Sequence, residues 1–294
     1  LLQETYEEMI KNNNTAILGY RGLMEQYLQA HDFHHAYIYG EKLFNINPYV
    51  EKIYETLVNI IAKTKHWQQL LLITDKALSK KIIDKLTYQE NKAIAFFEIS
   101  KIKKDSNRED SIKLIEKAIK LKKNFPPFVD LYVNLLIENK QYDFAKKTLR
   151  RAWSDFPHLD YKSNIMLLAK NLDMSFHELA KHIVGSNNSK EESKILLVEA
   201  AIDNNKWQEA RNQIKDLLDV KPKRDICLLM AKIEEGDSND IQKVNSWKLR
   251  AKNGEISNLW VCSITNKPQN DWSSLSNSGY FNSLVWNRCH LQPV

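Results

Sequence analysis

An aromatic residue followed three positions later by a small or aliphatic residue recurs along the chain, each time directly after a short polar stretch. The first two copies lie 34 residues apart. A repeat of that length predicts helix–turn–helix units that stack on one another, because one short amphipathic helix pair cannot bury its apolar side alone. The copies pair Phe33 with Ala36, Trp67 with Leu70, Tyr142 with Ala145, and Trp207 with Ala210.

Apolar residues between the copies follow helical spacing. Ile17, Tyr20, Leu23, Tyr27 and Leu28 fall at steps of mainly three and four, which is typical of one face of a helix. Only 7 Gly and 7 Pro occur in 294 residues, which favours long helices over turn-rich sheets. Twelve residues beyond the small position of three copies stands a proline, which we expect to end the second helix: Pro48, Pro157 and Pro222.

These patterns predict an all-α solenoid of helical pairs with a small, different module at its C-terminal end. We expect a first segment, 1–14, that starts the first helix or links to a preceding membrane anchor. An N-terminal array (15–185) and C-terminal repeats (190–255) follow, with a polar break at 185–189 as a joint. The helical pairs are predicted at 15–47, 50–83, 87–123, 127–156, 160–185, 190–221 and 225–253, and the module at 256–294.

The aromatic and small positions resemble those of the tetratricopeptide repeat family, whose superhelical arrays bind protein partners. In that family the first helices of successive pairs line a concave groove. The resemblance implies that polar side chains at the corresponding positions face a bound peptide or helix. Those positions are Arg21, Glu25, Asn59, Lys63, Asn134, Glu138 and Glu199.

The C-terminal segment is rich in Trp, Ser, Asn and Gly in place of Lys and Leu. Its residues 260–262 (Trp-Val-Cys) and 278–286 (Ser-Gly-Tyr-Phe-Asn-Ser-Leu-Val-Trp) resemble the zinc ribbon that follows the repeats in alphaproteobacterial HemY-type proteins. Segments 18–23, 151–158 and 227–236 resemble the same family in the same order, so the resemblance covers essentially the whole chain.

The ribbon's four cysteine ligands are not retained. Only Cys262 matches, while Thr265 stands at the second position, Leu275 or Ser276 at the third, and Ser278 at the fourth. Hydroxyl and alkyl groups do not replace thiolates, so we predict a metal-free, degenerate ribbon. A site of Cys262, Cys289 and His290, or a Cys262–Cys289 disulfide, is a less favoured alternative. The shape is expected to depend on Trp260, Trp272, Phe281, Leu284 and Trp286.

The charge is mildly basic, with a formal net charge of +6. Acidic residues are interspersed, which argues against nucleic acid as a partner. Three scattered cysteines favour a reducing compartment. The densest basic patch is a candidate surface for an acidic protein or anionic lipid, although an ordinary solvated helix face is the more usual explanation. It comprises Lys113, Lys117, Lys120, Lys146, Lys147, Arg150 and Arg151, with Lys122 and Lys123 beside it.

No phosphate-binding loop, dinucleotide fingerprint, metalloprotease motif or nucleophile elbow is present in the sequence. We therefore predict no catalytic centre and no cofactor. Haem ligation by histidines is the alternative that remains, because His31, His34 and His35 cluster in one turn region and His177 and His182 lie further along. Turn and surface histidines seldom have that role, so haem binding is not favoured.

The resemblance implies a non-catalytic scaffold that gathers or regulates late haem-biosynthesis enzymes. We expect an N-terminal anchor, absent from this chain, to hold it at the inner membrane with the repeats facing the cytoplasm. The sequence itself contains no apolar run long enough to span a bilayer. Two alternatives stay open: a tetratricopeptide/rubredoxin-type adaptor that regulates lipopolysaccharide synthesis, and a haem or porphyrin carrier.

Overall fold

The computed structural model describes residues 2–218 and 221–288 and consists of helices followed by a small sheet. The chain forms two compact units. The first comprises residues up to 106 together with 120–122 and 260–285, and the second comprises 107–119, 123–259 and the residues from 286 onward. None of the helices within the described residues is both long and apolar enough to cross a membrane.

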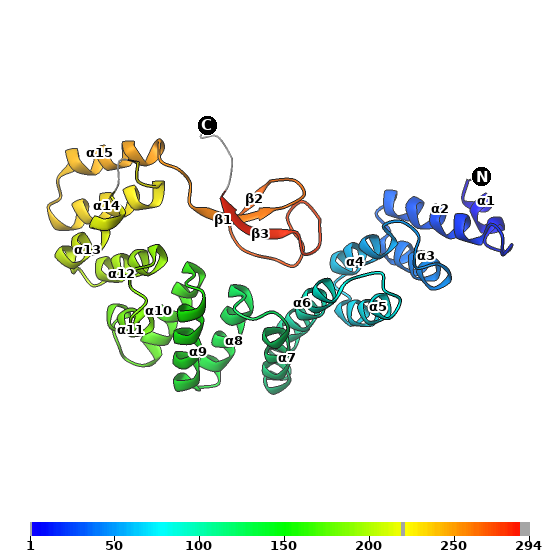
Figure 1. Cartoon of the computed structure of the whole chain (residues 1–294), viewed down its shortest axis with the longest axis horizontal. Helices are drawn as coiled ribbons and strands as arrows, with labels where there is room; N and C mark the ends of the chain where they lie inside the picture. The colour runs from blue at the N-terminus through cyan, green and yellow to red at the C-terminus, as the bar shows by residue number, and fades with distance from the viewer. Residues whose placement is uncertain (1, 219–220, 289–294) are drawn as a thin grey trace. The chain divides into compact units, whose positions relative to one another are not determined.

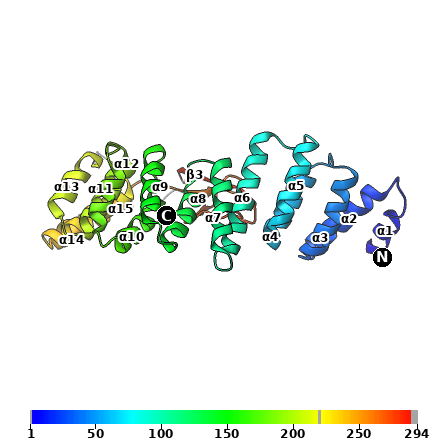
Figure 2. The ribbon, with the colours of Figure 1, turned by 90° about the horizontal axis from the view of Figure 1, so that it is seen from below.

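The first unit is built from helices that pack on their neighbours in sequence, as Figures 1 and 2 show in blue and cyan. Polar turns separate them. The second helix of the first two pairs begins with an aromatic residue, the half-buried Phe33 in α3 and the buried Trp67 in α5. The helices are α1 (Leu2–Met9), α2 (Ala16–Gln29), α3 (Phe33–Ile46), α4 (Ile53–Thr64), α5 (Trp67–Ser79) and α6 (Lys85–Lys103).

The second unit continues the same architecture. Its helices are α7 (Arg108–Leu121), whose last residues count with the first unit, α8 (Pro126–Glu138), α9 (Tyr142–Asp155), α10 (Lys162–Asn171), α11 (Phe176–Val184), α12 (Glu191–Asp203), α13 (Trp207–Ile214), α14 (Arg224–Asp237) and α15 (Ile241–Lys252). Short 3-10 turns at Leu159–Tyr161 and Lys215–Leu217 complete it. The predicted helical pairs are thus confirmed, with limits that differ by a few residues.

Five of the turns inside the pairs share one backbone device. In these five, a residue with positive φ follows the first helix, and the next amide donates to a carbonyl five residues earlier, as from Gln141 to Leu136 at 2.8 Å. This bond satisfies a carbonyl that the helix end leaves free. None of the positive-φ residues in these turns is glycine; they are His31, Lys65, Lys140, Asp173 and Asn205.

The repeat positions read from the sequence form the core. The small positions Ala36, Leu70, Ala145 and Ala210 are all 0% exposed. Pro48 and Pro157 directly follow the ends of α3 and α9. The expectation for Pro222 is wrong in detail, because α13 ends at Ile214 and its 3-10 extension at Leu217, several residues before the proline.

The C-terminal module contains three strands, β1 (Asn258–Cys262), β2 (Pro268–Gln269) and β3 (Leu284–Arg288), in the order β2-β1-β3. β1 and β2 pair antiparallel, with Trp260 opposite Gln269. The helices end at Lys252, so the change of texture in the sequence marks a change of structure.

The division of the repeats at 185–189 stays a prediction. In the structure these residues lie inside the second unit. There the Asn187 side-chain amide donates to the backbone carbonyl of Trp153 at 3.2 Å, which ties the stretch to α9.

Candidate partner-binding pocket

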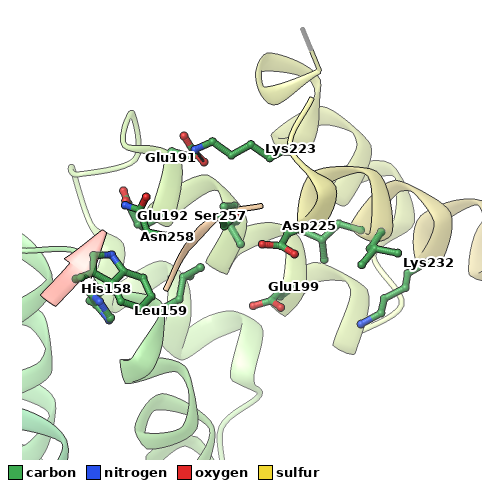
Figure 3. Close-up of a pocket in the computed structure, with 14 residues that line it drawn as sticks. His158, Leu159, Glu191, Glu192, Glu199, Lys223, Asp225, Lys232, Ser257 and Asn258 are labelled. Atoms are coloured by element: carbon green, nitrogen blue, oxygen red, sulfur yellow. Dashed lines mark hydrogen bonds and ion pairs between the residues drawn. The ribbon is translucent and has the colours of Figure 1, made fainter. Parts of the chain in front are cut away.

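A cavity of about 290 Å³ opens in the second unit between the first helices of two successive pairs, α12 and α14. Both helices present one face to it, because their lining residues recur at steps of three to four. Figure 3 shows the carboxylates of Glu199 from α12 and Asp225 from α14 projecting towards the same space. The remaining helical lining residues are Glu191, Glu192, Ile195, Leu228, Leu229 and Lys232.

The local sequence explains where the two helices that carry these side chains begin. α12 starts after the polar stretch 185–190, with Glu191 and Glu192 in its first turn, where carboxylates interact favourably with the helix dipole. Asp225 takes the equivalent place in the first turn of α14. The first turns of both helices therefore contribute acidic side chains to the lining of the cavity.

The floor of the pocket is apolar. Ile195 and Leu229 are 7% and 5% exposed, and Leu159 and Trp286 close the cavity from other parts of the second unit. Leu228 is 37% exposed at the pocket. An apolar side chain that moves from water onto an accessible apolar surface of this kind gains free energy by the hydrophobic effect.

His158 is the one ionisable group buried in the floor, at 2% exposed. Its ring lies 4.3 Å from that of Trp286, and its Nδ1 accepts from the Asp160 amide at 3.3 Å. Burial lowers the pKa of His158 to about 4, although the Glu192 carboxylate acts in the opposite direction. The imidazole is therefore neutral near pH 7, and the floor carries no charge.

The rim is acidic, and its carboxylates fall into two classes. Glu191 pairs with Lys223 at 2.5 Å, and Glu199 pairs with Lys162 at 2.9 Å. Within the described part of the chain, neither Glu192 nor Asp225 forms a salt bridge with a lysine or arginine. Each of the helices α12 and α14 thus contributes one carboxylate that forms no salt bridge with a lysine or arginine in the described part of the chain.

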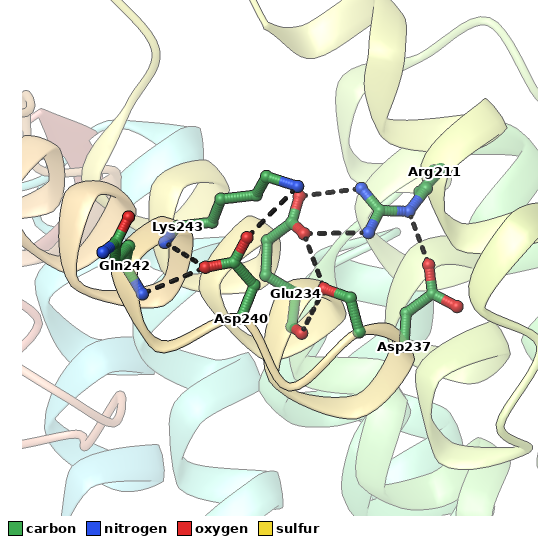
Figure 4. Close-up of polar contacts among 7 residues, drawn as sticks. Arg211, Glu234, Asp237, Asp240, Gln242 and Lys243 are labelled. Carbon is green, nitrogen blue, oxygen red and sulfur yellow. Dashed lines mark hydrogen bonds and ion pairs between the residues drawn. The ribbon is translucent and has the colours of Figure 1, made fainter.

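A polar network on the far side of α14 fixes that helix against α13 (Figure 4). Arg211 donates to both carboxylate oxygens of Glu234 at 2.8 and 2.9 Å and to Asp237 at 2.9 Å. Glu234 is 4% exposed. The guanidinium lowers the pKa of Glu234, and the carboxylates raise the pKa of Arg211. Such bidentate pairs hold both partners in one geometry.

Among the predicted groove residues, Glu199 is the one that lies in this pocket. Arg21 and Glu25 pair with each other at 2.9 Å and line a separate pocket of the first unit. In the second unit, Asn134 donates to Asp130 at 3.3 Å and Glu138 lies 3.7 Å from Arg108. Their role in binding a partner stays a prediction.

The other two predicted groove residues, Asn59 and Lys63, contact the chain's own C-terminal module within the first unit. Asn59 Oδ1 accepts a hydrogen bond from the Phe281 amide at 2.8 Å. Lys63 lines a cavity together with Ser273, Ser274 and Leu275. Two further contacts come from α6: Glu90 accepts from the Asn282 side chain at 3.2 Å, and Phe97 meets Trp272 edge to face at 5.5 Å.

Inside the module, the positions that resemble zinc ligands come together, with one cysteine, Cys262, and hydroxyl side chains at the others. Thr265 and Ser278 hydroxyls lie 2.9 Å apart, and Ser276 Oγ lies 3.8 Å from Cys262 Sγ. Of the two candidates for the third position, Ser276 is therefore the one at the cluster. Burial raises the pKa of Cys262, but its hydrogen bonding with Ser283, Thr265 and the Ile264 backbone outweighs burial and lowers this pKa to about 6.

The aromatic framework expected for the module is present in part as contacts with helices. Trp260 and Leu284 are 3% and 6% exposed, and Trp272 packs on Phe97. Cys289 and His290 lie outside the described residues, so the alternative that uses them is not tested. Over the described residues, no group of three or more His, Cys, Asp and Glu is arranged to hold a metal.

The histidines considered for haem lie apart from the pocket. His31, His34 and His35 are exposed at the first turn, where His35 Nδ1 lies 2.7 Å from Asp32. His177 is buried 3.0 Å from Glu209, and His182 is exposed on α11. None of them lines the α12–α14 cavity.

The basic patch lies on α7 and α9, and its side chains are exposed apart from the half-buried Lys146. Lys113 pairs with Glu109 at 2.7 Å, while Arg151 is 4.0 Å from Asp155. Burial first, and then the charges of Lys146 and Arg150, lower the pKa of His182. The face around α9 is thus positive, which agrees with the charge pattern of the sequence, and its partner stays a prediction.

Sequence reasoning missed most of the pocket. Glu192, Asp225 and Leu228 were not singled out, and Trp286 was expected to support the shape of the C-terminal module. Yet Asp225, Leu229 and Lys232 recur at steps of four and three on one predicted helix. That spacing, applied to first helices that stack side by side, is the signal that could have found them.

Comparison with protein-family models gives no match, and neither does comparison with curated protein sequences. Solved structures are similar at low identity. A tetratricopeptide repeat protein from Parabacteroides merdae ATCC 43184 has 13% identity over 84% of this chain and 99% of that chain, with a TM-score of 0.37. Pseudomonas aeruginosa pilF has 14% identity over 82% of this chain and 92% of that chain, with a TM-score of 0.31. Yeast Tom70 has 17% identity over 82% of this chain and 53% of that chain, with a TM-score of 0.42. The repeat fold therefore stands on this chain's own helix pairs, buried small residues and shared turn.

Proposed function

We propose that the chain is a non-catalytic protein–protein interaction scaffold that holds a segment of a partner protein in the α12–α14 pocket. The observation that carries the proposal is an apolar floor with an acidic rim on the first helices of two successive pairs. First helices are the surface by which repeat arrays of this kind bind their partners.

The size and chemistry of the cavity support a side-chain ligand over a cofactor. Its 290 Å³ is at the lower end of the roughly 300–1,000 Å³ of small-molecule sites. General acids and bases work best with a pKa near the working pH, whereas the pKa of buried His158 is about 4. The pocket is therefore better suited to holding than to proton transfer.

The finer part of the proposal concerns the partners and the location. The resemblance to HemY-type proteins supports late haem-biosynthesis enzymes as partners, and an anchor outside this chain that holds the repeats at the cytoplasmic face of the inner membrane. The positive face around α9 suits an anionic membrane surface nearby.

Site-specific photo-crosslinking in cells tests the proposal. A photoreactive amino acid replaces Leu228 in the pocket, and a matched variant carries it at Leu249, which is 61% exposed on α15 and outside the pocket. We expect adducts with late haem-pathway enzymes from position 228 and not from position 249. Both variants must keep the thermal unfolding midpoint of the unmodified protein.

The other outcomes are equally informative. Adducts from position 228 with lipopolysaccharide-synthesis proteins would keep the scaffold and replace its partners with those of the adaptor alternative. Equal adducts from both positions, or none from position 228, would reject this pocket as the binding site. Co-purification of porphyrin without protein adducts would favour the carrier alternative.

A further inference from the structure

We propose that the α12–α14 pocket recognises a partner segment in which a large aliphatic or aromatic side chain is flanked, within one helical turn, by lysine or arginine. This inference rests on the proposed function and names the chemistry of its ligand.

The apolar part of the ligand follows from the floor. Leu228 is 37% exposed, while Ile195 and Leu229 beneath it are almost fully buried. Trp286 adds an aromatic wall, and neutral His158 packs against that wall at 4.3 Å. A polar side chain inserted here would leave its hydrogen bonds to water and gain few in return, so an apolar anchor is favoured.

The basic part of the ligand follows from the rim. Four carboxylates line the cavity against two lysines, Lys223 and Lys232. Lys223 is already paired with Glu191, and Lys162 from outside the lining is paired with Glu199. Glu192 and Asp225 are left to face the cavity from opposite helices, so a cation beside the anchor could interact with both.

The charge of the rest of the chain sharpens this selection. The protein has a formal net charge of +6, so a basic partner is repelled by the surface in general and attracted at this rim. Opposed potentials of this kind orient a charged partner as it approaches. An anionic ligand, such as a phosphate group or an acidic peptide, would meet Glu192 and Asp225 with unfavourable charge.

Selection from a displayed library of random 12-residue peptides tests the inference on the full chain. We expect the enriched peptides to share one large apolar residue with lysine or arginine three or four positions away. Replacing their basic residues with Gln should weaken binding about three- to tenfold in fluorescence anisotropy, with a smaller difference at high salt.

A variant with reversed charge at the pocket rim tests whether the carboxylates select the basic residues of the peptide. The double variant Glu192→Lys/Asp225→Lys should select peptides with acidic residues around the same apolar anchor. The matched control is Asp203→Lys/Glu235→Lys, which changes two exposed carboxylates on the same two helices outside the cavity and should leave the selection unchanged. Circular dichroism establishes that both variants are folded.

The two levels of the proposal fail in different ways. Enrichment of apolar peptides without basic residues, or a selection that the pocket variant does not change, would overturn the inferred ligand and leave the scaffold intact. Failure of any peptide to be enriched would overturn the pocket as a polypeptide-binding site, and with it the proposed function.

Discussion

The two units are built from the same kind of helix pair, but the first helices of these pairs make different contacts in each unit. In the first unit, Asn59 of α4 accepts a hydrogen bond from the chain's own C-terminal module at 2.8 Å. In the second unit, Glu199 of α12 lines a cavity and is bonded only to a neighbouring lysine. Equivalent positions on one architecture therefore serve an internal contact in one unit and an accessible pocket in the other.

The chemistry of the side chains accounts for this difference. The Asn59 amide donates to the Glu55 carbonyl and accepts from the Phe281 amide, so it satisfies a backbone group that would otherwise lose its bond to water. Phe97 and Trp272 add apolar contact next to it. The charged rim of the second unit has no comparable neutral partner, since a carboxylate is better left accessible or paired with a cation. Four measurements test whether the two units differ in this way.

Acid should destabilise the second unit more than the first. Because burial lowers the pKa of His158 from 6.5 to about 4, the unfolded chain takes up a proton over that interval and the folded chain does not. The contribution is complete above pH 6.5, and roughly 3 kcal/mol of unfolding free energy should be lost as the pH falls to 4. Denaturant unfolding at several pH values measures it.

The control for this loss is His158→Phe, which keeps a ring against Trp286 and cannot be protonated. Its unfolding free energy should change less between pH 7 and pH 4 than that of the unmodified protein. The histidines of the first unit, His31, His34, His35 and His66, are exposed. An equal acid response in both proteins would contradict the assignment to His158.

Trp272→Ala should loosen the module from the first unit. A fully buried Trp→Ala change costs about 3–5 kcal/mol, and because Trp272 is half-buried we expect about 2 to 3. Hydrogen exchange of the Phe281 amide should accelerate, since its acceptor Asn59 would no longer be held against it. Trp247→Ala, on α15 of the second unit, should leave that amide unchanged.

Arg211→Ala should weaken the second unit and leave the first intact. The change leaves the buried Glu234 carboxylate without its guanidinium partner. We expect the unfolding free energy to fall by about 2 kcal/mol, after allowance for the partial exposure of Arg211. Because the pair lowers the pKa of Glu234, its contribution is present above the carboxylate's unfolded pKa and disappears as the pH falls through the folded value. The difference between variant and parent should therefore shrink below pH 4.

A glycine in one turn of each unit should have the smallest and most uniform effect. Lys65 and Lys140 both have a φ near 58°, which costs a residue with a Cβ atom about 1 kcal/mol relative to glycine. Lys65→Gly and Lys140→Gly should each raise the unfolding free energy by up to that amount. The exposed helical Lys76→Gly should lower it instead. Unequal gains would mean that the turns of the two units are not equivalent.

Sequence predicted the local parts of this structure well. The aromatic and small positions at fixed spacing, the polar turns and the scarcity of glycine all act within one helix pair, and the pairs lie where the spacing puts them. The change at 256 is also local, because Trp, Ser and Asn there replace helix-forming residues. Positive φ at Lys65 and Lys140 was not foreseen, since lysine gives no signal for that conformation.

The candidate site was much less predictable. Its apolar lining combines Leu159, Ile195, Leu229 and Trp286, which are distant in sequence and meet only after the chain folds. Asn59 was predicted to face a partner in the groove, and its spacing could not reveal that it accepts a hydrogen bond from the Phe281 amide. Long-range contacts depend on how the module returns to the helices, which helical periodicity does not encode.

The hydroxyl cluster of the module has a consequence for how the protein is assembled in the cell. A thiolate cage is completed only when an ion is delivered, and until then it competes with chelators and oxidants. Here the Thr265 hydroxyl is hydrogen-bonded to the Ser278 hydroxyl, and the Ser276 hydroxyl donates to Cys262 Sγ. We therefore predict that the module closes without a delivered ion, so that a chelator present during synthesis should leave the Asn59–Phe281 contact intact.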